Sequence, residues 1–94
     1  METRDQTLSA LLLARKQIMR GYRTNERGDI LFRFDDSEGV RQIEDGFYQN
    51  TELVAVQDFA AALRQVKNII FKLRNSNYYD NTITTGSTRI QNTR

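Results

Sequence analysis

The chain has 94 residues, of which 14 are basic and 12 acidic, and its net charge is +2. It contains no Cys and no His, which excludes disulfides, the usual zinc sites and the common nucleophile–base pairs of enzymes. No apolar run approaches the ~20 residues that a membrane span needs. We therefore expect a small binding or structural protein with no catalytic role, no metal or cofactor and no membrane partner.

Charge is unevenly distributed along the chain. Residues 1–34 carry seven basic and four acidic side chains, residues 35–58 one and seven, and residues 59–94 six and one. Arg outnumbers Lys eleven to three, and the Arg guanidinium suits interface ion pairs and phosphate contacts. An acidic segment between two basic segments suits a surface that meets copies of itself, although a solvated charged surface is the plainer interpretation.

The first predicted element is a helix over residues 5–20, capped by Thr3 or Asp5 and ended at Gly21. Its apolar face comprises Leu8, Leu11, Leu12, Ile18, Met19 and Tyr22. Arg15 falls within this face, where an unpaired charge is costly to bury. We expect its side chain to reach solvent, and the alternatives are a carboxylate partner or a neighbouring subunit.

A β-hairpin is predicted next, after a polar connector at residues 22–29. Ile30–Phe34 has the composition of a strand, with Ile30, Phe32 and Phe34 facing inward and Arg33 outward. Residues 35–39 supply a turn, and Val40–Glu44 supplies a weaker return strand. Residues 51–55 are expected to form a short extended piece.

The strongest pattern is an amphipathic helix that starts near Val56 and runs to Leu73. Its apolar face comprises Phe59, Ala62, Leu63, Val66, Ile69, Ile70 and Leu73. Asp58 complements the positive end of the helix dipole. Asn75–Asn77 is predicted to stop the helix.

These elements predict an α+β fold in which two helices pack on a β-hairpin in the order α-β-β-α. Residues 1–74 form the single domain, and residues 75–94 form an extended polar tail. The body is marginal in size, so association with other subunits is the expected source of extra stability. The tail would dock on a partner through its large or basic side chains, namely Tyr78, Tyr79, Ile83, Arg89, Ile90 and Arg94.

Basic residues gather around the end of the first predicted helix. They are Arg15, Lys16, Arg20, Arg23 and Arg27. Such a patch could contact DNA phosphates without reading sequence, or could lie at a subunit interface. The adjacent carboxylates Asp35 and Asp36 are expected in a turn for backbone reasons rather than for catalysis.

The predicted order of helix, hairpin, helix and polar basic tail resembles the W-type head-to-tail joining proteins of tailed bacteriophages. The residues that carry the resemblance are Leu8, Ile18-Met19-Arg20-Gly21, Val56-Gln57-Asp58-Phe59 and Leu63. The resemblance implies a connector subunit in a ring, a dodecamer in that family, beneath the portal protein. It also implies docking of the tail or a stopper or collar protein, non-specific contact with packaged DNA, and a place in the virion at the head–tail junction after assembly in the host cytoplasm.

Two other functions are compatible with the sequence. The first is a small phage or plasmid nucleic-acid-binding protein that uses the patch from Arg15 to Arg27. The second is an inhibitor that blocks a host enzyme through the acidic middle of the chain.

Overall fold

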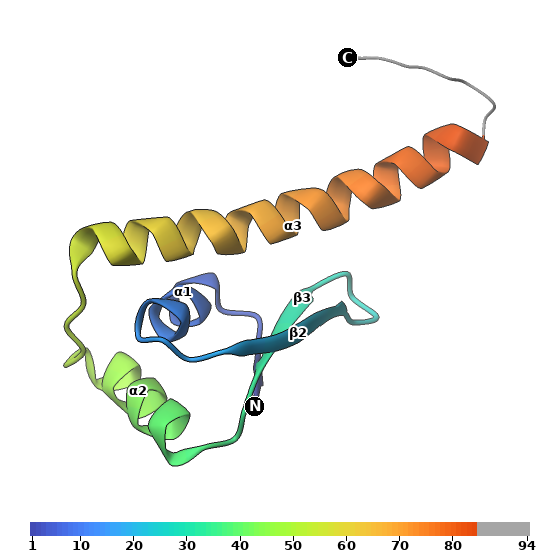
Figure 1. Cartoon of the computed structure of the whole chain (residues 1–94). Helices are drawn as coiled ribbons and strands as arrows, with labels where there is room; N and C mark the ends of the chain where they lie inside the picture. The colour runs from blue at the N-terminus through green and yellow to red at the C-terminus, as the bar shows by residue number, and fades with distance from the viewer. Residues whose placement is uncertain (85–94) are drawn as a thin grey trace.

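The computed structural model describes the backbone of residues 1–84 and the side chains of residues 1–75. Its elements are β1 (Glu2–Thr3), α1 (Gln6–Ala14), β2 (Met19–Thr24), β3 (Ile30–Phe34), α2 (Glu38–Gln49) and α3 (Val56–Thr84) (Figure 1). The strands form an antiparallel sheet in the order β1-β3-β2. The predicted α+β class is confirmed. The predicted α-β-β-α order is wrong in detail, because three helices are present in this part of the chain and a short first strand precedes them.

Helix α1 is the centre of the fold. It packs against α3, α2 and β1, and five consecutive residues, Leu8–Leu12, are buried (Figure 1). The polar member of this run, Ser9, donates its hydroxyl proton to the Asp5 carbonyl oxygen at 2.9 Å. Buried polar groups need such a partner, so Ser9 fits within an otherwise apolar core.

Helix α1 is shorter than predicted because it ends in a Schellman motif. The Lys16 N–H donates to the Leu13 carbonyl at 3.0 Å, and the Gln17 N–H donates to the Leu12 carbonyl at 2.9 Å. Lys16 has a φ of 69°, the left-handed conformation that Gly usually supplies. Asp5 caps the other end by accepting the Leu8 N–H at 2.9 Å. The prediction that the helix continues to Arg20 and ends at Gly21 is therefore wrong.

The β-hairpin is formed by β2 and β3, one element earlier than predicted. The alternation within β3 is confirmed, since Ile30, Phe32 and Phe34 are buried and Arg33 is exposed. A bulge between Met19 and Gly21 leaves Arg20 as the extra residue of β2. On the inner face, Tyr22 meets Phe32 edge-to-face at a centroid distance of 6.4 Å.

Residues 38–49 form helix α2, so the predicted return strand at Val40–Glu44 is wrong. Ser37 caps this helix by accepting the Val40 N–H at 3.2 Å. Val40 and Ile43 are buried toward α1. Asn50 ends the helix with a φ of 61°, and Thr51 donates its N–H to the Gly46 carbonyl at 2.9 Å.

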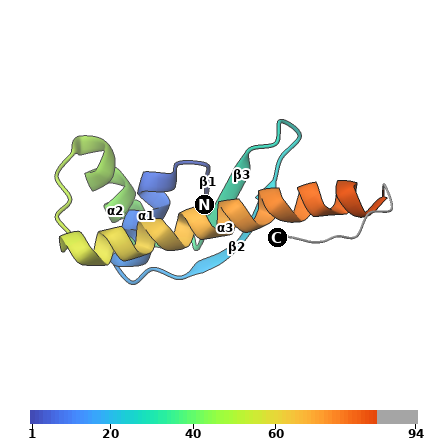
Figure 2. The same cartoon turned by 90° about the horizontal axis from the view of Figure 1, so that it is seen from above.

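Helix α3 passes over α1 and continues beyond the sheet (Figures 1 and 2). Its predicted inner face is confirmed: Ala62, Val66 and Ile70 are buried, and Phe59, Leu63, Ile69 and Leu73 are partly buried against the core. The helix does not stop at Asn75–Asn77, as predicted, but runs to Thr84. The residues from 75 to 84 therefore belong to α3 rather than to an extended tail.

Two identical substitutions on α3 test this packing. Val66 is fully buried, whereas the Val56 side chain is 81% exposed. Val66→Ala should lower the free energy of unfolding by about 2–3 kcal/mol, from the lost methyl groups and the resulting cavity. Val56→Ala should change it by less than about 0.5 kcal/mol. Urea denaturation followed by circular dichroism measures both, and equal effects would show that the helix face is misassigned.

Candidate interaction surfaces

The predicted basic patch is divided among different parts of the fold. Arg15 and Lys16 lie at the end of α1, Arg20 and Arg23 lie on β2, and Arg27 lies in the hairpin turn. Arg15 forms an ion pair with Glu52 in the α2–α3 connection. The expectation that the Arg15 side chain reaches solvent is confirmed, because it remains 40% exposed, and the alternative of a carboxylate partner is realised as well.

Two bidentate arginine–carboxylate pairs lie at the outside of the sheet. Arg23 donates to both carboxylate oxygens of Glu2 at 2.8 and 2.9 Å. Arg20 donates in the same way to Asp35 at 3.0 and 2.8 Å. These pairs join β2 to β1 and to the loop that follows β3. Their geometry is the parallel fork that favours Arg over Lys at such positions.

These contacts shift the pKa of both carboxylates. The hydrogen bond from Arg23 lowers the pKa of Glu2, and the hydrogen bond from Arg20 lowers the pKa of Asp35. The same bonds raise the pKa of the two guanidinium groups. Arg20 and Arg23 are thus already neutralised by neighbouring acids. They contribute less to an attractive field for phosphate than their number in the sequence suggests.

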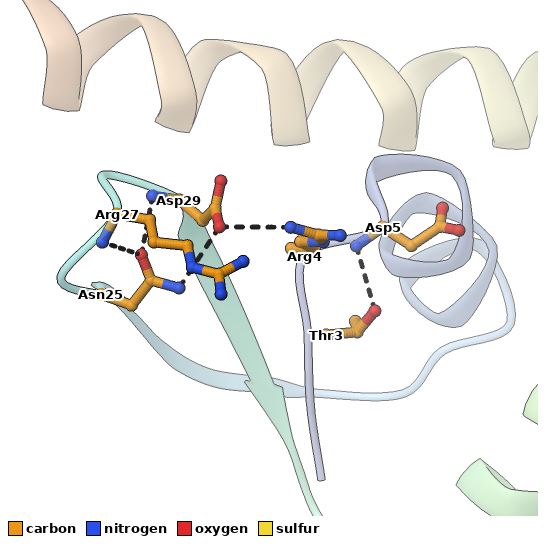
Figure 3. A network of polar contacts seen from close by, with 6 residues as sticks. All are labelled: Thr3, Arg4, Asp5, Asn25, Arg27 and Asp29. Atoms are coloured by element: carbon orange, nitrogen blue, oxygen red, sulfur yellow. Dashed lines mark hydrogen bonds and ion pairs between the residues drawn. The ribbon is translucent and has the colours of Figure 1, made fainter.

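The hairpin turn is held by a polar network (Figure 3). The Asn25 side-chain oxygen accepts the backbone N–H groups of Arg27 at 3.0 Å and Asp29 at 2.9 Å. Asp29 in turn pairs with Arg4 at 3.3 Å, and Gly28 adopts a φ of 86°. Figure 3 shows the network lying between the turn and the segment that leads into α1. Its bonds mainly satisfy backbone groups, so we assign this network a structural role.

Three of the exposed large apolar side chains among the described residues lie in or next to the α2–α3 connection. Tyr48, Leu53 and Val56 are 66%, 88% and 81% exposed, and they fall within nine consecutive positions. A hollow of about 210 Å³ is lined by chain neighbours of these residues, not by the three exposed residues themselves. It is lined by Thr7, Leu11, Gly46, Phe47, Asn50, Glu52, Val54 and Phe59. Exposed apolar groups beside a hollow are typical of protein docking sites.

Gly46 allows this connection to pack closely on α2. A Cβ atom at position 46 would collide with the side chain of Glu52. Glu52 is the partner of Arg15, so the glycine, the carboxylate and the arginine fix the connection against α1 together. The sequence pattern gave no sign of this contact.

The outward side of α3 is basic over the described side chains. Arg64, Lys67, Lys72 and Arg74 are exposed, and the sequence has no acidic residue between Asp58 and Asp80. Phe71 lies among them and is 64% exposed. The sequence pattern did not single out Phe71.

The predicted docking tail divides between two parts of the chain. Tyr78, Tyr79 and Ile83 have positions within the backbone of α3. Arg89, Ile90 and Arg94 lie outside the described residues. Comparison with protein-family models, curated proteins and solved structures finds no match for this chain. No helix in the described part is both long and apolar enough to cross a membrane.

The pairing of Asp35 with Arg20 gives a testable pH dependence. Because the pKa of Asp35 is lowered on folding, the pair stabilises the protein above the ordinary value of 3.8. That contribution is lost as the pH falls through the lowered value. Arg20→Gln should raise the pKa of Asp35 back toward its ordinary value, as measured by carboxyl-carbon NMR titration. Arg27→Gln is the matched control, and an equal shift in both variants would contradict the assigned pair.

Proposed function

We propose that the chain is a non-enzymatic docking subunit that binds further copies of itself through the α2–α3 connection. The observation that carries this proposal is the concentration of exposed apolar side chains at Tyr48, Leu53 and Val56, around a connection that also lines a hollow through Glu52 and Val54. Exposing apolar surface of this kind to water is unfavourable, and covering it with a partner releases that free energy. The small body gives a second reason, because association adds buried area to a core of marginal size.

The size of the hollow favours a protein partner. Pockets for drug-sized ligands and cofactors occupy about 300–1,000 Å³. The hollow beside the connection holds about 210 Å³, which suits one large side chain of a neighbouring subunit. Its lining from Leu11, Phe47, Val54 and Phe59 is apolar and would accept an aliphatic or aromatic group.

In its specific form, the proposal is a phage connector subunit. Copies would form a ring beneath a portal protein, dock the tail or a collar protein, and help to retain packaged DNA. This form rests on the sequence resemblance. Leu63 and Val56–Phe59 keep the helical positions that the resemblance assumes, whereas Met19–Gly21 lies in β2 instead of a helix. Cryo-electron microscopy of particles tests the connector form, and particles that join heads to tails without this protein would exclude it.

Self-association through the connection is tested by a charge placed in the apolar surface. Leu53→Asp should abolish oligomers of the isolated protein in native mass spectrometry, because a carboxylate at an interface loses hydration when it is covered. The variant should stay folded, since Leu53 is 88% exposed. Ile18→Asp is the control, because Ile18 is also exposed at 61% but lies immediately before β2, away from the α2–α3 connection in sequence. A monomeric wild-type protein at all concentrations would refute self-association.

A further inference from the structure

Helix α3 carries a stripe of three cations and one aromatic ring. Its members are Arg64, Lys67, Phe71 and Arg74, here called the α3 stripe. Their spacing of three and four residues places them within an arc of about 80° on the helix. At about 1.5 Å per residue, the stripe extends over about 15 Å of the helix. Lys72 lies on a different side, about 100° away from Phe71.

The cations of the stripe are available to a partner. All five ion pairs among residues 1–75 use basic residues that precede α3, namely Arg4, Arg15, Arg20, Arg23 and Arg41. On this side of the helix no carboxylate alternates with the cations. The stripe therefore presents uncompensated positive charge, in contrast to Arg20 and Arg23 on the sheet.

Phe71 points away from the core, although its neighbour Ile70 is buried. A hollow of about 390 Å³ opens beside it. The hollow is lined by Gln6, Lys67, Ile70, Phe71, Arg74 and Asn75. It thus combines an aromatic face, an aliphatic wall, two cations and two side-chain amides. The amides can donate hydrogen bonds to a planar group and accept bonds from it.

We infer that the α3 stripe binds single-stranded nucleic acid. Arg64, Lys67 and Arg74 contact successive phosphates, and one base enters the hollow and stacks on Phe71. Single-strand sites combine a cationic track with an exposed aromatic platform in this way. A duplex keeps its bases inside the helix, so its backbone could use the cations but could not use Phe71. This inference is independent of self-association, because it uses the outward side of α3 rather than the α2–α3 connection.

Fluorescence anisotropy with a labelled thymidine oligonucleotide of about 15 nucleotides tests the site on the full chain. Phe71→Ala should weaken binding by about 5- to 100-fold through the lost stacking. Phe71→Trp should restore it. Replacing Arg64, Lys67 and Arg74 by Gln should reduce the slope of log K against log salt by about 2, since each single-strand phosphate contact contributes about 0.7. Circular dichroism confirms that each variant keeps its helices.

The matched control removes the same charge from another side of the helix. Lys67→Gln should weaken binding clearly, whereas Lys72→Gln should leave it nearly unchanged. Equal losses in these two variants, or binding that is unaffected by Phe71→Ala, would overturn the site and indicate unspecific attraction by net charge. Equal affinity for a duplex of the same length would overturn the single-strand assignment. The protein could also fail to bind the oligonucleotide and form salt-sensitive oligomers that Lys67→Gln dissociates. That result would overturn the nucleic-acid site and show that the stripe binds the acidic surface of a second copy.

Discussion

The fold depends on the burial of one short helix. Helix α1 has nine residues, too few to be stable alone in water. It persists because five consecutive residues are covered by α3, α2 and the strands, and because both of its ends are capped. Asp5 closes one end and Lys16, held in a left-handed conformation, closes the other. The middle of α1 is therefore covered on every side, whereas Gln6 and Thr7 at its start stay exposed.

That arrangement explains where polar and apolar groups remain on the outside. Ion pairs connect the strands to neighbouring segments, through Arg23–Glu2 and Arg20–Asp35, and these pairs offset the charge of two of the three arginines on the strands. Helix α3 needs only its inner side to cover α1, so its outward side is free to carry other groups. The α2–α3 connection must turn the chain between two helices that both pack on α1. Leu53 in the connection and Val56 at the start of α3 remain exposed as a result.

The sequence predicted the elements whose patterns agree with their packing. The inner side of α3 and the alternation of Ile30, Phe32 and Phe34 follow directly from helical and strand periodicity. The C-terminal end of α1 could not be predicted from periodicity, because Lys16 occupies the left-handed position at which Gly usually marks the end of a helix. Helix α2 was missed for the opposite reason. The segment was assigned to a turn and a return strand, although Val40, Ile43 and Phe47 recur at helical spacing.

The candidate sites show a similar division. Arginines counted along the sequence appeared to form one patch, yet folding gave Arg15, Arg20 and Arg23 separate carboxylate partners. Ion pairing depends on neighbours that are distant in sequence, so it could not be deduced from local composition. Conversely, Phe71 and Leu53 became prominent only when their exposure was known. The cationic surface lies on α3, and the exposed apolar surface lies around the connection that leads into α3. A subunit that docks through the connection would therefore hold the outward side of α3 in a defined direction, and a ring of such subunits would repeat that cationic surface at regular intervals.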